Sequence, residues 1–335
     1  MKNLDVQSII DSLTQIDSKR QYWFVRTQSG NYYEEFVAKN FIAIGYNEIK
    51  LSDISKAKDG VELNAETLSE IIRKAYPDEL RPRYIGNQLV DFAYNIKKGD
   101  IVLIPSESTG LVSIGEVAET PIFIGKQDSI IINSCPFNKR KRINWLKTNL
   151  IFDRLDPQLL HLKYSQRTVT HIDENTIKII DRLITPIFIK DNDAHLSLDV
   201  KQVEPIKALE LFETWLDIFN LVEDISENEG YKVKKDDFEI KINVQSPGTI
   251  EFISYSIIGI VLMSTILAAL IGAEIDIDTK IIKFHIKTEG LIKRVTEYLN
   301  AKSDRNFREK LLEKVQKMKI SSDELVRILE KVNTK

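Results

Sequence analysis

An uncharged, largely apolar segment, residues 252–273, limits the folds open to this chain more than any other feature. A helix rises about 1.5 Å per residue, so a segment of this length is able to cross the ~30 Å hydrocarbon core of a bilayer. Serine, threonine and glycine residues dilute the run, and lysines lie on both flanks, so a span would place one basic flank outside. The sequence favours a helix buried in its own domain, with a membrane span as the alternative.

The chain has 335 residues, which is long for one domain and predicts two. The N-terminal segment carries acidic residues and no long apolar core, so a signal peptide is not expected and the cytoplasm is the favoured location. The one cysteine, Cys135, excludes an internal disulfide and a cysteine-based zinc cluster. The four histidines are too far apart in sequence for a local metal motif, so neither a metal nor a cofactor is expected: His161, His171, His195 and His285.

Composition shifts divide the chain into two modules. Residues 1–190 alternate short strand-like and helix-like patterns, and residues 191–204 form a polar segment that is interpreted as a linker. Pro205 then stands where proline starts a helix well. Residues 205–335 are the second module. Both modules mix strands with helices, so the predicted fold class is α+β.

The second module is expected to be an α+β unit with a central apolar helix and terminal helices. A faint repeat relates residues 244–252 to residues 286–294, because each matches a strand, a glycine turn and the start of an apolar helix. The last helix has a capping-box pattern at Ser321 and Glu324. These features suggest that the second module forms a homo-oligomer.

A β-hairpin is predicted in the first module at residues 97–117, KKGDIVLIPSESTGLVSIGEV. Gly99-Asp100 is a turn that leads into an apolar strand, Ile101–Ile104. Pro105 ends that strand because proline has no N–H for the ladder. The return strand carries Gly115 at a point where another backbone is able to come close. Strands of this kind commonly line a small barrel.

The hairpin resembles the signature of PUA-like EVE modules, in which a Gly-Asp turn precedes one barrel strand and a Gly-x-Val strand returns. YWFVRTQSGNYYEEFVAKNFIAIGYNEI (22–49) resembles the opening of the EVE-like module found in front of some Mrr-type restriction proteins. QLVDF (88–92) resembles its Gln-x-x-x-Phe helix, and KRINWLKT (141–148) its Arg-x-x-Trp segment. The resemblance covers about residues 20–185 and implies a small PUA-like β-barrel with helices.

The resemblance also implies a pocket that holds one flipped-out base, often a modified one, between aromatic and polar side chains. Such recognition needs a π face, worth ~1–3 kcal/mol per base, and hydrogen bonds to the base edge. Trp23 and Tyr46 are the candidate stacking residues, with core packing as the alternative role. The candidates for the base edge are Asn47, Ser106 and Gln88, with turn capping as the alternative for Asn47 and Ser106.

Phosphate binding requires a local basic patch, because the net charge of −3 provides no basic field over the whole chain. Arg26 is one candidate, on the strand that carries Trp23. A second is the basic run Lys139, Arg140, Lys141 and Arg142, whose alternative is a solvated loop.

The sequence contains no strong catalytic motif, and an enzyme is the less favoured class. Asp237, Glu239 and Lys241 match the Glu-x-Lys pattern of metal-dependent nucleases, in which carboxylates hold Mg²⁺ and the lysine supports the attacking water. That triplet is common by chance in a charged strand.

The favoured function is a nucleic-acid-binding sensor. Its N-terminal module would recognise a modified base in DNA, with RNA as an alternative partner, and its C-terminal module would act as effector or oligomerisation unit, plausibly in defence against phage. The alternatives are a Mg²⁺-dependent restriction-type nuclease acting on modified DNA and a membrane-linked effector that uses residues 252–273.

Overall fold

The computed structural model describes residues 10–11, 13–56, 65–106, 110–118, 122–126, 134–242, 248–272, 295–299 and 305–320. The chain forms two compact units. The first consists of residues 19–184, and the second combines residues 1–18 with residues 185–335. Each unit contains a sheet with helices, so the predicted α+β class is confirmed.

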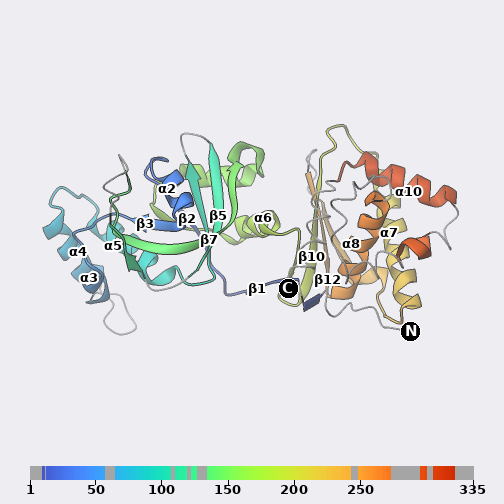
Figure 1. Ribbon diagram of the computed structural model, residues 1–335, viewed down its shortest axis with the longest axis horizontal. Helices are drawn as coiled ribbons and strands as arrows, with labels where there is room; N and C mark the ends of the chain where they lie inside the picture. The colour runs from blue at the N-terminus through green and yellow to red at the C-terminus, as the bar shows by residue number, and fades with distance from the viewer. Residues whose placement is uncertain are drawn as a thin grey trace. The chain divides into compact units, whose positions relative to one another are not determined.

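The first unit is built on a curled, half-barrel sheet with strand order β3-β7-β5-β4-β2-β8. A further short strand, β6, pairs with β7 outside this order. Among the described strands, β3 and β8 form the two ends of this order, so the barrel stays open. β2 and β4 are parallel, and the other pairs are antiparallel. Figure 1 shows β7 as a long, curved strand. The strands are Tyr22–Val25 (β2), Phe41–Ile44 (β3), Ile101–Ser106 (β4), Leu111–Val117 (β5), Phe123–Ile124 (β6), Lys139–Ile151 (β7) and Val169–His171 (β8).

The central strands read as continuous apolar runs because both faces of the sheet are covered. In β2, Tyr22 and Phe24 pack in one core cluster, while Trp23 and Val25 pack in another. The first cluster is closed by α6 (Glu174–Ile184) and by a 3₁₀ segment, η3 (Pro157–Tyr164). Three further helices carry side chains into the second cluster: α2 (Tyr33–Ala38), α4 (Ala65–Ala75) and α5 (Pro82–Val90).

Two short segments complete the helical cover of the first unit. α3 (Leu51–Lys56) packs against α4 and α5. A π-helical turn, η1 (Asp91–Asn95), continues directly from α5 and buries Phe92. A further 3₁₀ turn, η2 (Phe152–Arg154), follows β7.

The second unit has a five-stranded sheet with order β1-β9-β10-β12-β11. β1 and β9 are parallel, and the remaining neighbours are antiparallel. The strands are Thr14–Ile16 (β1), Ile187–Lys190 (β9), Asp193–Val200 (β10), Phe238–Ile242 (β11) and Gly248–Ser254 (β12).

Helices α7 (Ala208–Asn228), α8 (Ile257–Gly272) and α10 (Arg305–Lys317) accompany this sheet, as Figure 1 shows. A 3₁₀ turn, η4 (Lys235–Asp237), precedes β11. Most of the described side chains of α8 are apolar and buried on every face, and the buried hydroxyls of Ser264 and Thr265 donate to the carbonyl of Val261, which is the pattern of a helix enclosed by its own domain. Within the described residues, no helix combines the length and apolarity needed to cross a bilayer. The segment 252–273 begins as strand β12 and only then becomes helical.

Three boundaries differ from the sequence-based prediction. The segment 191–204 is not a linker, because residues 193–200 are strand β10, at the centre of the sheet. The first unit ends at Ile184 rather than at residue 190. Residues 14–16, expected in the first module, form β1 and belong to the second unit.

Parts of the predicted second module lie outside the described residues. They include residues 286–294 of the faint repeat and the capped helix beginning at Ser321. In the other half of the repeat, Gly248 opens strand β12 and does not form a turn before a helix.

Candidate nucleic-acid interface

Trp23 is part of the core and presents no free aromatic face in this structure. Its side chain is buried, with 4% exposed. The indole N–H donates to the carboxylate of Asp100 at 3.0 Å, and the ring meets the edge of His171 at 5.1 Å between centroids. A base could not stack on this indole without displacing neighbouring side chains.

Tyr46 and Asn47 lie in a turn after β3 whose hydrogen bonds are internal. Tyr46 has a φ of 58° and directs its hydroxyl to Glu79, and burial raises the pKa of this phenol to about 12. The Asn47 amide donates to the carbonyl of Pro136 at 2.9 Å and accepts from the backbone N–H of Asn138 at 3.1 Å. Asn47 therefore links its own turn to residues 136–138 through long-range hydrogen bonds.

The basic run 139–142 is the first part of strand β7 and not a loop. Lys139 and Lys141 are 1% and 0% exposed, and both donate to backbone carbonyls. Burial lowers the pKa of each lysine to about 8. Arg140 is also buried and donates to the carbonyls of Phe137 and Cys135. Of the four residues, only Arg142 is exposed. The prediction of a phosphate-binding run is therefore corrected for Lys139, Arg140 and Lys141, whose buried side chains donate to backbone carbonyls.

The three remaining predicted residues, Arg26, Ser106 and Gln88, lie around one end of the sheet. Arg26 follows the last residue of β2, and Ser106 is the last residue of the parallel strand β4. Gln88, on α5, accepts from the N–H groups of Thr168 and Val169 at 2.5 and 3.2 Å. It thereby fixes the start of β8 at this same end.

Arg26 is connected to the loop that precedes β8. Its guanidinium donates to the carbonyl of Ser165 at 2.8 Å, and its backbone N–H donates to Thr168. Ser106 is buried, with 3% exposed. Tyr164, immediately before this loop, is 81% exposed. The loop 165–168 is thus held between Arg26, at the end of β2, and Gln88, on α5. The exposed ring of Tyr164 directly precedes it.

Two arginines lie against the ring of one tyrosine at this end. The guanidinium carbon of Arg81 lies 4.9 Å from the centre of the Tyr84 ring, and that of Arg167 lies 5.7 Å from it. Tyr84 and Arg81 are contributed by α5 and its N-cap, and Arg167 by the loop that Gln88 holds. We define the arginine–tyrosine surface as Arg26, Arg81, Tyr84, Tyr164 and Arg167.

Arg167 is only partly neutralised by the protein. One terminal nitrogen lies 3.3 Å from the carboxylate of Asp91, and the side chain is 41% exposed. The buried Nε has no hydrogen-bond acceptor among the described residues. A guanidinium with unused donors beside an aromatic ring is suited to bind phosphate or to cover the face of a base.

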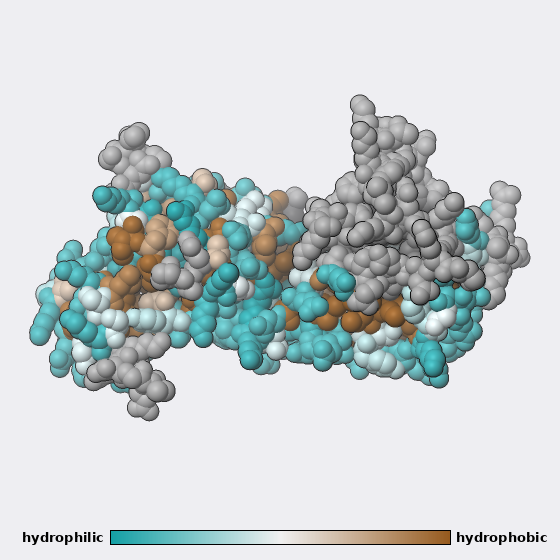
Figure 2. Space-filling view, turned by 60° about the horizontal axis from the view of Figure 1, so that its bottom comes forward, coloured by the Kyte–Doolittle hydropathy of each residue, from teal (hydrophilic) through white to brown (hydrophobic). Residues whose placement is uncertain are grey.

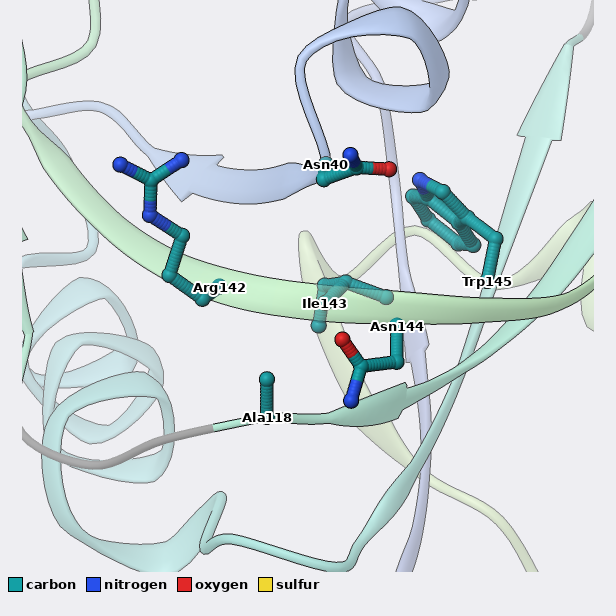
Figure 3. Close-up of a pocket in the computed structure, with 6 residues that line it drawn as sticks. All are labelled: Asn40, Ala118, Arg142, Ile143, Asn144 and Trp145. Carbon is teal, nitrogen blue, oxygen red and sulfur yellow. The ribbon is translucent and has the colours of Figure 1, made fainter.

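An open pocket occurs at a different place in the first unit, beside strand β7. It encloses about 550 Å³ and is lined by Asn40, Ala118, Arg142, Ile143, Asn144 and Trp145, as Figure 3 shows. None of the predicted base-binding residues lines it. Arg142, from the predicted phosphate-binding run, does.

The weak nuclease triplet is not assembled as a metal site. Asp237 accepts from the Tyr255 hydroxyl and from the backbone N–H of Lys234. Glu239 and Lys241 point outward on β11, at the edge of the sheet. Within the part of the chain that the structure describes, no three histidine, cysteine or acidic side chains are grouped to hold a metal ion.

Residues 23–173 match the model of a family described as a domain of unknown function (DUF8426). The match covers most of the first unit, including β2 through β8. No curated protein and no solved structure was found to match the chain. The matched residues include the five residues of the arginine–tyrosine surface.

Proposed function

We propose that this protein is a nucleic-acid-binding sensor whose first unit contacts DNA through the arginine–tyrosine surface. The observation that carries the proposal is that the guanidinium groups of Arg81 and Arg167 both lie close to the Tyr84 ring, at 4.9 and 5.7 Å from its centre. Arginines that flank aromatic rings bind nucleic acid because guanidinium groups bind phosphates while the rings stack on bases. The net charge of the chain is −3, so binding of this kind depends on a local surface.

The base that we propose to be read is a flipped, modified one, as the EVE-like resemblance of residues 20–185 implies. A flipped base needs an accessible π face. The ring of Tyr164 is 81% exposed, whereas Trp23 is buried and the Tyr84 ring carries the guanidinium groups of Arg81 and Arg167. We therefore move the proposed stacking role from Trp23 and Tyr46 to Tyr164, and Tyr84 is proposed to position the two arginines. Arg26 keeps its proposed role toward phosphate.

The second unit is proposed to transmit or execute the response against phage DNA and to form a homo-oligomer. Three apolar side chains of α7 support oligomerisation because they are exposed at helical spacing: Leu209 at 71%, Phe212 at 60% and Leu216 at 52%. The face shown in Figure 2 is largely hydrophilic, with apolar residues in separate patches. Sedimentation velocity of wild type and of Phe212→Ser is the measurement, and a monomer in both would contradict the oligomer.

The binding proposal is tested by fluorescence anisotropy with duplexes that differ only in one modified or unmodified cytosine. Full-length wild type is expected to prefer the modified duplex. Tyr164→Ala is expected to lose about 1–3 kcal/mol of binding free energy. Tyr84→Ala is expected to weaken binding to both duplexes, because Arg81 and Arg167 lose the ring on which they lie. Arg167→Gln is expected to weaken binding to both duplexes and to lower the slope of log K against log [salt] by about one.

Arg73→Gln is the matched control because Arg73 is an exposed arginine of the same unit, on α4, paired with Glu66. It removes one positive charge away from the arginine–tyrosine surface and should leave binding unchanged. If Arg167→Gln and Arg73→Gln reduce affinity equally, the surface has no special role. Equal affinity of wild type for both duplexes would contradict modified-base reading.

A further inference from the structure

Strand β7 continues well past the point where its neighbour β3 begins. β3 pairs with residues 139–142 of β7, and the N–H of Ile143 donates to the carbonyl of Asn40, immediately before β3. From there to Ile151, β7 pairs with β5 on its other edge. Beyond Ile143, no described strand pairs with β7 on the edge that β3 occupies at residues 139–142. The pocket beside Trp145 lies at this notch.

The sequence around the notch is suited to keep the pocket open. Asn40 has a φ of 55°, a left-handed conformation that asparagine tolerates better than most residues. Gly115 pairs with Trp145, and a Cβ at Gly115 would lie 2.7 Å from the indole Cε3. Because Gly115 has no side chain, the indole is able to pack directly against strand β5. In Figure 3 the Asn40 amide points toward this indole.

The indole N–H of Trp145 is an unused donor. Its nitrogen is buried and has no acceptor among the described residues, whereas the ring as a whole is only half-buried. A buried polar group without a partner is costly, so a ligand that supplied an acceptor, after a small movement of the rim, would be favoured. The neighbouring Asn40 and Asn144 are exposed and offer both amide donors and carbonyl acceptors.

The charge of the lining selects the ligand class. Of the six lining residues one is a cation, Arg142, and none is acidic. The guanidinium of Arg142 lies 4.6 Å from the centre of the Phe123 ring, which holds it in place while its side chain remains exposed. The pocket therefore combines a π surface, amide groups and one fixed positive charge. Its volume of about 550 Å³ is in the range of small-molecule sites.

We propose that this pocket binds a nucleoside 5′-monophosphate. The base lies against the Trp145 indole with its edge toward Asn40, and the phosphate pairs with Arg142. The ligand is either a free mononucleotide or the 5′-phosphorylated end of a strand, which present the same chemistry. The inference rests on the pocket alone and is independent of binding at the arginine–tyrosine surface.

The test is isothermal titration of the full-length protein with the ribose and deoxyribose 5′-monophosphates of each base and with the matching nucleosides. At least one monophosphate is expected to bind more tightly than its nucleoside. Arg142→Gln should weaken the monophosphate about tenfold or more and leave the nucleoside unchanged, because only the phosphate meets the guanidinium. Trp145→Ala should abolish binding of both.

Two milder variants separate loss of contact from loss of fold. Asn40→Gly removes the amide but suits the left-handed backbone, and Trp145→Phe keeps a ring but removes the N–H. Each is expected to bind several-fold more weakly with an unchanged melting temperature. Arg73→Gln is again the charge control and should bind the mononucleotide like wild type. Binding that Arg142→Gln or Trp145→Ala leaves intact would place the site elsewhere and overturn the proposal.

A 5′-phosphorylated dinucleotide distinguishes the two sources. Binding of both the mononucleotide and the dinucleotide, lost together in Trp145→Ala, identifies a strand end. Binding of the mononucleotide alone identifies a free nucleotide. If no monophosphate and no phosphorylated dinucleotide binds at millimolar concentration, the proposal is wrong.

Discussion

The indole nitrogen of Trp23 lies 3.0 Å from a carboxylate oxygen of Asp100, and this bond connects two parallel strands, β2 and β4. The same carboxylate accepts from the backbone N–H of Lys97 at 2.8 Å and from that of Gln21 at 3.1 Å. Asp100 is 4% exposed. The Gly-Asp turn of the hairpin therefore fastens the start of β4 to β2 and is a structural junction rather than a part of the binding surface.

Asp100→Asn is expected to destabilise the first unit. The substitution keeps the shape but replaces one acceptor oxygen by an NH₂ group that faces other donors, and a buried donor left without an acceptor costs about 1–3 kcal/mol. Urea unfolding of the full chain measures the change. Asp78→Asn is the control, since Asp78 is exposed. A difference below about 0.5 kcal/mol between the two variants would contradict the structural role.

Lys139 and Lys141 are expected to make the free energy of unfolding depend on pH in the alkaline range. Burial lowers the pKa of each lysine from its usual value near 10.5 to about 8 in the folded chain. Between these values the unfolded state binds more protons, so the free energy of unfolding rises as pH increases through this window. Wild type is expected to gain stability from pH 8.0 to about 9.5, below the range in which tyrosines titrate. Lys141→Met should show a smaller gain over the same interval. An equal gain would mean that Lys141 titrates normally.

Gln88 is expected to order the loop that carries Arg167. Gln88→Met removes the acceptor for the N–H groups of Thr168 and Val169, whereas Gln88→Glu keeps an acceptor oxygen. Hydrogen exchange at these two amides should therefore become faster in Gln88→Met and remain slow in Gln88→Glu. Unchanged exchange in both variants would show that the loop is held by other contacts.

Gly115→Ala is expected to displace the Trp145 indole and to destabilise the pairing of β5 with β7. The new Cβ would lie 2.3 Å from Cγ2 of Ile143 and 2.7 Å from the indole, so β7 must shift, at a cost of about 1–3 kcal/mol. Gly86→Ala is the comparison because its closest contact, 3.3 Å, is the end of the Leu68 side chain and alanine favours the helix. Thermal unfolding of both variants gives the result. Equal melting temperatures would contradict the tight contact.

The sequence predicts strands best where a segment consists almost entirely of apolar residues. The apolar strands 22–25 and 101–104 were expected and are present, because both faces of that sheet are buried. The strand Asp193–Val200 was missed although it alternates polar and apolar residues, because its polar members resemble a linker. Strand β7 was missed because Lys139 and Lys141 read as surface residues, and only the structure shows carbonyls around their ammonium groups.

The candidate surface was only partly predictable. Arg26, Gln88 and Ser106 were named from the resemblance and lie at one end of the sheet. Tyr84 and Arg167 were not, because they are distant in sequence and meet only after α5 and the loop before β8 pack together. The orphan N–H of Trp145 has no sequence signal either, since it depends on where β3 begins.

Thr14–Ile16 pairs in parallel with residues 188–190, so the chain belongs to the second unit both before residue 19 and after residue 184. The DNA-binding candidate is therefore an insertion with two covalent tethers, which start from neighbouring strands. Because β1 and β9 are hydrogen-bonded to each other, both attachments of the inserted unit lie side by side in one sheet. A double attachment of this kind restrains both ends of the inserted unit, whereas a single linker would restrain one.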